Sequence, residues 1–204
     1  MEIRDARPEE YAAIAEMTVA AYLAVGVAPD APYMAELRDA EHRAKNAELV
    51  VAVDGGRLVG SVTFAPFGSE YAELARPGEA EFRMLVAAPA EQGRGIGAAL
   101  VAECLRRARV IRAPTLRLST APSMHAAHRL YDRLGFHRVP ELDWEPIPGI
   151  ILRSYAAPTA FCAHCGSPLI TGDHAPCRTA LTEGPPDWCP WCRTPTPCPA
   201  HHAT

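Results

Sequence analysis

The sequence predicts an α/β fold in which strands and amphipathic helices alternate along residues 3–155. Three observations carry this prediction. Two apolar runs flank Asp54-Gly55-Gly56, a turn typical of a tight hairpin. A glycine-rich stretch at 92–97 separates an apolar run from a stretch of helical period. A second helical pattern ends at Gly135, the residue type that most often follows the last turn of a helix.

The N-terminal part of the chain is expected to form one strand and two helices. Residues 3–5 predict a short strand. Apolar residues then recur at helical spacing between Pro8, a favourable first helical residue, and Gly26, so a helix is expected between them. Residues 31–46 predict a second helix.

The remaining elements follow from the same patterns. The expected order is strands at 49–53 and 58–64, a Pro/Gly-bearing loop at 66–78, a strand at 81–87, a helix at 98–109, a strand at 116–119, a helix at 122–134, and strands near 136–139 and 150–155. Cys104 lies at an apolar position of the helix expected at 98–109 and is expected in the core.

The turn at 92–97, called here the glycine turn, favours phosphate binding. It consists of Gln92, Gly93, Arg94, Gly95, Ile96 and Gly97, and Ala98 follows it. The first amides of a helix lack intrahelical acceptors and carry the positive end of the helix dipole. Glycines let a phosphate approach this backbone closely, and Arg94 adds a cation.

Two other phosphate-binding folds are excluded. Gly93, Gly95 and Ala98 satisfy a degenerate Rossmann pattern, but no Asp or Glu occurs between positions 113 and 131, where that fold needs an acidic residue for the ribose. A P-loop is excluded because no Gly-Lys-Ser/Thr follows the turn.

Two motifs together resemble the GNAT superfamily of acetyl-CoA-dependent N-acetyltransferases. Gln92, Gly95 and Gly97 match its Gln/Arg-x-x-Gly-x-Gly/Ala loop, and Tyr131, Gly135 and Phe136 match its Tyr-x-x-x-Gly-Phe motif. The resemblance implies a domain over 1–155 with a mixed, mostly antiparallel sheet flanked by helices. It also implies that the strand at 81–87 splays away from the strand at 116–119 to open a cofactor cleft.

The resemblance implies acetyl transfer from acetyl-CoA to an amine by direct attack. Leu85 would supply the amide that stabilises the oxyanion, Val86 and Ala87 would pair with the pantetheine arm, and residues Gln92 to Ala98 would hold the pyrophosphate. Tyr131 would protonate the departing thiolate. The general base is expected to be Glu81, with Asp143, Glu145 and His137 as substitutes.

Composition narrows the partners. The formal charge of −4 and the pI of about 6.1 argue against binding to nucleic acid or an anionic membrane surface. The sequence offers no apolar run long enough to span a membrane and no signal peptide, so a cytoplasmic location is expected.

After residue 155 the composition changes, and a separate metal-binding module is expected over 156–204. Six of the seven cysteines fall there. Together with two histidines they form four pairs at a spacing suited to zinc: Cys162/Cys165, His174/Cys177, Cys189/Cys192 and Cys198/His201. One zinc ion held by Cys162, Cys165, Cys189 and Cys192 is preferred over two ions using all eight residues. An iron-sulfur cluster is a third possibility, because this tail also resembles biotin synthase auxiliary proteins.

The acceptor is expected to be a small-molecule or peptide amine, bound by the segments 27–46 and 67–78. Tyr33, Glu36 and Tyr71 in these segments could face a cationic acceptor. The alternative is a non-catalytic acyl-CoA-binding platform, whose metal module would bind a partner protein.

Overall fold

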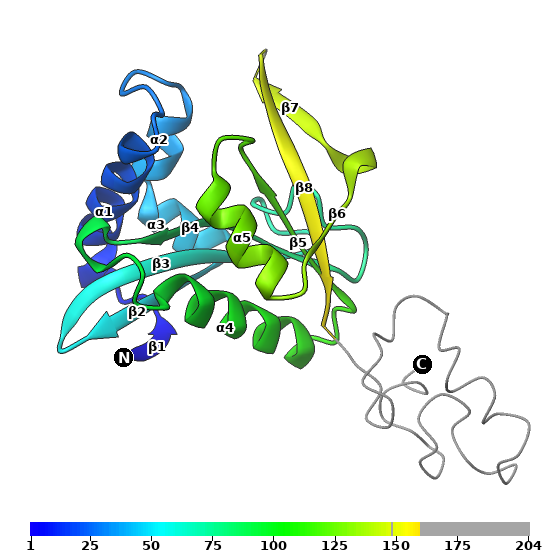
Figure 1. Ribbon diagram of the computed structural model, residues 1–204. Coiled ribbons are helices and arrows are strands. Elements are labelled where there is room, and N and C mark those ends of the chain that lie inside the picture. Colours follow the sequence, from blue (N-terminus) through cyan, green and yellow to red (C-terminus); the bar gives the residue numbers. More distant parts are fainter. Residues whose placement is uncertain (148, 160–204) are drawn as a thin grey trace, which may run out of the picture. The chain divides into compact units, whose positions relative to one another are not determined.

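The computed structural model describes residues 1–147 and 149–159, which are built around one mixed sheet (Figure 1). The strands are β1 (Glu2–Asp5), β2 (Glu48–Asp54), β3 (Arg57–Pro66), β4 (Ala80–Ala87), β5 (Thr115–Thr120), β6 (His137–Arg138), β7 (Trp144–Ile147) and β8 (Ile150–Pro158). Their order is β1-β2-β3-β4-β5-β8-β6, and β7 pairs with β8 off this path. The pairs β1–β2, β2–β3, β3–β4, β6–β8 and β7–β8 are antiparallel and β4–β5 is parallel, so the sheet is mixed and mostly antiparallel, as predicted.

Five α-helices accompany the sheet in this described part. They are α1 (Tyr11–Ala24), α2 (Tyr33–Arg38), α3 (Ala40–Asn46), α4 (Ile96–Val110) and α5 (His125–Arg133), with short 3-10 turns at Pro8–Glu10, Pro89–Glu91 and Pro140–Leu142. None of the helices in residues 1–147 and 149–159 has the length and apolarity needed to cross a bilayer.

Apolar residues of β2 explain why the sheet is covered on both faces. Val50 and Ala52 belong to the core cluster that includes α4, whereas Leu49 and Val51 pack with Ile14 of α1 on the other face. Alternate residues of a strand point to opposite faces, so a run that is apolar at every position requires cover on both. Figure 1 shows α4 and α5 near each other and α1 to α3 grouped apart from them.

The predicted helix at 31–46 is in fact two helices. Asp39 leaves the helical conformation (φ −91°, ψ 69°), and its carboxylate accepts a hydrogen bond from the His42 amide at 2.9 Å. Asp competes for backbone amides in this way and is a favoured helix cap, which the apolar spacing alone did not reveal. β7 was also missed, because Pro146 weakens a strand pattern.

Candidate active site

β4 and β5 pair at one end and then diverge. The parallel pairing joins Ala80 to Leu116 and Glu81 to Arg117. It is reinforced by Arg117, whose Nη2 donates to Glu79 Oε1 at 2.7 Å. Both strands continue past these positions, yet no further residue pairs between them are formed in the part of the chain that the structure describes. The edge of β4 beyond Glu81 is therefore open on the β5 side.

A bulge lies on this open part of β4. Thr63 of β3 pairs with Arg83 and Ser61 pairs with Val86, so Met84 and Leu85 both oppose Val62. Met84 has a positive φ of 52°, which is rare for a residue with a side chain. A one-residue insertion bends the strand and reverses the face that each following side chain occupies.

The glycine turn leads directly into α4. Gly93 (φ +81°) and Gly95 (φ +79°) adopt the left-handed conformation that glycine tolerates best. Gly95 precedes the helix, and its carbonyl accepts the first helical hydrogen bond, from Ala99 at 3.0 Å. The amides of Ile96, Gly97 and Ala98 therefore have no acceptor within the helix.

Gly97 lies where three elements meet. A Cβ atom built on Gly97 would lie 3.2 Å from Leu130 of α5 and 4.0 Å from Leu85 of β4. The N-terminus of α4, the bulge of β4 and the helix α5 are therefore in contact. The distance to Leu130 is tighter than usual for a Cβ atom, so a larger residue at position 97 would require Leu130 to shift.

Arg94 is held by acidic neighbours. Its Nη2 pairs with Asp54 at 2.8 Å, and its Nη1 pairs with Glu91. These contacts neutralise the cation that the sequence placed at the mouth of the turn. Binding of a phosphate by this side chain would require it to leave at least one of the two carboxylates.

The Tyr-x-x-x-Gly-Phe motif is a helix-ending structure. Gly135 has φ +82° and donates to Asp132 O at 3.2 Å, while the Phe136 amide donates to Tyr131 O at 3.0 Å. These are the two hydrogen bonds of a Schellman motif, in which the residues at the positions of Tyr131 and Phe136 make an apolar contact. Their rings are 5.8 Å apart. The motif therefore fixes the position of Tyr131.

Tyr131 lies in an aromatic cluster with Phe82, Phe136 and Tyr155, whose ring centroids are 5.8 to 5.9 Å from that of Tyr131. Burial raises the pKa of its hydroxyl above the ordinary value of 10. The group is therefore protonated at neutral pH, which is the state needed for a proton donor.

Glu81 lies at the point where β4 and β5 separate. Its side chain is fully buried, and its Oε2 accepts hydrogen bonds from the amides of Leu74 (2.6 Å) and Ala75 (3.2 Å). Its Oε1 has no hydrogen-bond partner among the described residues. Burial raises the pKa of this carboxyl from 4.5 to about 7, although the two amides act in the opposite direction.

The substitute bases lie around β6, β7 and β8. Asp143 pairs with Arg138 at 2.6 Å, and the hydrogen bond from Arg138 lowers the pKa of Asp143. A lowered pKa makes this carboxylate a weaker base. His137 and Glu145 are exposed.

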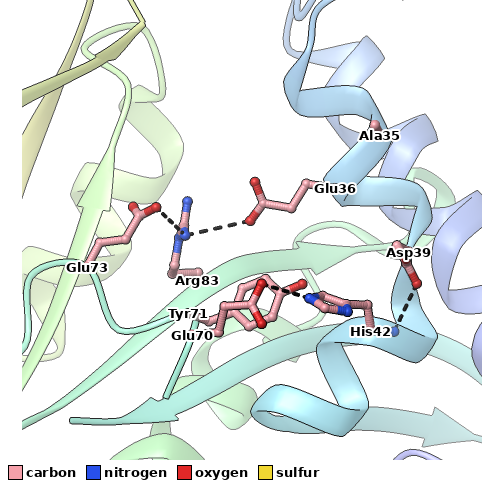
Figure 2. Close-up of a pocket in the computed structure, with 8 residues that line it drawn as sticks. All are labelled: Ala35, Glu36, Asp39, His42, Glu70, Tyr71, Glu73 and Arg83. Atoms are coloured by element: carbon pink, nitrogen blue, oxygen red, sulfur yellow. Dashed lines mark hydrogen bonds and ion pairs between the residues drawn. The ribbon is translucent and has the colours of Figure 1, made fainter. Parts of the chain in front are cut away.

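A pocket of about 450 Å³ lies next to β4 (Figure 2). It brings together the two segments expected to bind the acceptor, because it is lined by Glu36, Asp39 and His42 from one and by Glu70, Tyr71 and Glu73 from the other, with Arg83 of β4. Of the three residues named from the sequence, Glu36 and Tyr71 line it. Tyr33 does not, but its ring lies 6.0 Å from the Arg83 guanidinium. Arg83 and Glu73 were not anticipated, since only folding brings them together.

Charged side chains in the pocket pair with one another. Arg83 Nη1 lies 2.9 Å from Glu73 Oε1 and 3.6 Å from Glu36 Oε1, and Figure 2 shows the two carboxylates on opposite sides of the guanidinium. His42 Nε2 lies 2.7 Å from Glu70 Oε1. Burial raises the pKa of Glu36, although Arg83 opposes this effect.

The predicted metal ligands lie outside the described residues. These are Cys162, Cys165, His174, Cys177, Cys189, Cys192, Cys198 and His201. Within 1–147 and 149–159, no group of three or more His, Cys, Asp or Glu side chains is placed to hold a metal ion. Cys104 is a buried free thiol of the core, as expected.

Several solved structures are similar in fold to this chain. An acetyltransferase from Staphylococcus aureus Mu50 is similar over 78% of this chain and 99% of its own (13% identity, TM-score 0.64). An acetyltransferase from Salmonella typhimurium with acetyl-CoA is similar over 78% of this chain and 94% of its own (22% identity, TM-score 0.58). A third acetyltransferase, from Brucella melitensis with acetyl-CoA, is similar over 67% of this chain and 82% of its own (29% identity, TM-score 0.51).

A comparison with curated proteins finds no match. The model of the acetyltransferase (GNAT) family matches residues 11–136, which is more than half of the sequence. The chain therefore belongs to the GNAT family of acetyltransferases.

Proposed function

We propose that the protein transfers the acetyl group of acetyl-CoA to the nitrogen of an amine by direct attack. The observation that carries this proposal is the meeting, at Gly97, of the open and bulged part of β4, the N-terminus of α4 and the helix that bears Tyr131. The presence of acetyl-CoA in the Salmonella typhimurium and Brucella melitensis structures supports the choice of cofactor.

The cofactor would extend from the glycine turn to the bulge. Residues Gln92 to Ala98 would bind the pyrophosphate, because the amides at the start of α4 have no acceptor within the helix. Val86 and Ala87 would pair with the pantetheine arm along the open edge of β4. The Leu85 amide would stabilise the oxyanion of the thioester carbonyl, an interaction worth about 10²- to 10³-fold in rate in other enzymes.

Glu81 and Tyr131 would move the protons. The attacking amine must lose a proton, and a carboxyl with a pKa of about 7 is suited to accept it at neutral pH. Since Glu81 is fully buried, we propose that it acts through a water molecule. The protonated Tyr131 hydroxyl would donate a proton to the CoA thiolate as it leaves.

The test compares Tyr131→Phe with Tyr155→Phe, because the two tyrosines share one aromatic cluster. Release of free thiol from acetyl-CoA is followed in the presence of a panel of amines. Tyr131→Phe is expected to lower kcat by about 10²-fold or more while acetyl-CoA binding is kept, as for the loss of a general acid. Tyr155→Phe should retain activity. Full activity in Tyr131→Phe would rule out the acid role.

Cofactor titration separates this function from a platform without catalysis. Tight binding of acetyl-CoA together with no thiol release across the panel would contradict the transferase. Thiol release that depends on the amine would support it.

The C-terminal Cys/His residues are proposed to bind zinc in a module over 156–204, through which the protein would contact a partner protein. Support comes from the four regularly spaced pairs in the sequence. Elemental analysis with an absorption spectrum of anaerobically purified protein tests this. Zinc at about one ion per chain is expected for a Cys162, Cys165, Cys189 and Cys192 site. Two ions would reject the single site, and iron with visible absorption would indicate a cluster.

A further inference from the structure

We propose that the pocket beside β4 selects acceptors that carry a second cationic group, namely aliphatic diamines or polyamines. The inference deepens the proposed function and rests on it, since it assigns the class of amine that the transferase acetylates. The pocket volume of about 450 Å³ is within the range of small-molecule sites and can hold an extended aliphatic diamine or polyamine.

Charge is the first argument. Four carboxylates line the pocket, on Glu36, Asp39, Glu70 and Glu73, against one guanidinium and one imidazole. Even with His42 protonated, these lining groups carry a net charge of −2. The hydrogen bond with Glu70 raises the pKa of His42, and the net charge above counts the imidazole as protonated. A cationic ligand would neutralise the remaining charge.

The position of Arg83 gives the second argument. It is the one guanidinium of the pocket lining, and it is shared by Glu36 and Glu73 rather than free. A carboxylate on the acceptor would have to compete with both of these side chains. An ammonium group would instead find a carboxylate that is partly desolvated and only weakly paired, because Glu36 lies 3.6 Å from Arg83. The geometry therefore favours a cation over an anion.

Glu81, the proposed base, lies outside the pocket lining but on the same strand as Arg83. Glu81 precedes Arg83 by two residues, so the two side chains lie on the same face of β4. Glu81 is fully buried, and its Oε1 has no partner among the described residues. One amine of the acceptor would approach this carboxyl and react, while the second would stay charged beside Glu36 and Glu73.

The experiment uses three acceptors with four carbon atoms each: 1,4-diaminobutane, n-butylamine and 4-aminobutanoate. They share one reacting amine and differ only in the far end, which is cationic, neutral or anionic. We expect the full-length protein to use the diamine with a kcat/KM at least about tenfold above that of n-butylamine, and 4-aminobutanoate least well. Equal values for the diamine and n-butylamine, or a preference for 4-aminobutanoate, would overturn the inference.

Charge-neutral variants test which residues are responsible. Glu36→Gln and Glu73→Gln should each reduce the ratio of diamine to n-butylamine kcat/KM by about fivefold or more. Glu41→Gln is the matched control, because Glu41 lies on α3 but outside the pocket lining and pairs with Lys45 at 2.7 Å. An unchanged ratio in both pocket variants would contradict the assignment.

Binding measurements separate this inference from the proposed function. Titration calorimetry with 1,4-diaminobutane and n-butylamine, in the presence of CoA, reports on the pocket without requiring acetyl transfer. Tighter binding of the diamine, weakened in Glu36→Gln, supports the pocket even in a protein that releases no thiol. Thiol release with other amines but no preferential diamine binding would refute the acceptor class and leave the transferase intact.

Discussion

Replacing Glu81 with Gln is expected to make the protein more stable at alkaline pH and to flatten its pH dependence. Gln is close in shape and can still accept hydrogen bonds from the Leu74 and Ala75 amides, which now donate to Glu81 Oε2. The substitution therefore removes the titratable proton and keeps the hydrogen bonds that join the loop at 67–79 to β4.

The magnitude follows from the pKa of the buried carboxyl. Burial raises the pKa of Glu81 from 4.5 to about 7, a difference that corresponds to about 3 kcal/mol. Below about pH 4.5 the group is protonated in both the folded and unfolded chain, so the full stability is present. As the pH rises, the unfolded chain ionises first, and stability is lost until the folded pKa is passed. About 2 kcal/mol of this loss falls between about pH 5.5 and pH 8.5.

The assay is urea denaturation of both proteins at these two pH values. All other titrating groups are common to the two proteins, so the free energy of unfolding of the wild type should fall by about 2 kcal/mol more than that of Glu81→Gln. Parallel pH dependences would show that Glu81 does not titrate in a buried site. A larger fall in the variant would show that the carboxylate is stabilised by a charge instead.

Two further predictions concern Gly60 of β3 and Gly95 of the glycine turn. A Cβ on Gly60 would lie 2.6 Å from Ile96 Cγ2 and 2.8 Å from the Val86 carbonyl oxygen. Gly60→Ala should therefore lower the free energy of unfolding, measured by urea denaturation, by about 1–3 kcal/mol. A loss below about 0.5 kcal/mol would contradict this packing. The Cβ of Gly95→Ala would meet no atom within 4 Å, but the residue must adopt φ +79°. This variant should lower the free energy of unfolding by about 1–2 kcal/mol and weaken acetyl-CoA binding in a calorimetric titration. Gly95→Asn should lose less stability, because Asn tolerates this conformation.

The parts of the site that the sequence predicts are those controlled by local backbone conformation. Gly93, Gly95 and Gly135 have positive φ, and a residue type with this freedom marks such a position in any sequence. Tyr131 was located through the Tyr-x-x-x-Gly-Phe motif of the family that the sequence resembles, and the Schellman motif explains why its position relative to Gly135 is fixed. The hairpin at Gly55 and Gly56 and the alternation of strands and helices are also local patterns.

The pocket and the open edge of β4 depend on contacts between distant segments. Glu36, Glu73 and Arg83 come from α2, a loop and β4, and no spacing in the sequence relates them. The bulge at Met84 and Leu85 exists only relative to Val62 of β3, since register is a property of two strands. The sequence by itself thus determined the glycine turn, the position of Tyr131 and the α/β class, because each follows from local backbone preferences. The divergence of β4 from β5 was expected only through the family resemblance, not from any local pattern. Tertiary structure alone decided the bulge of β4, the burial of Glu81 and the charge of the pocket, because register, burial and electrostatics arise when separate segments pack.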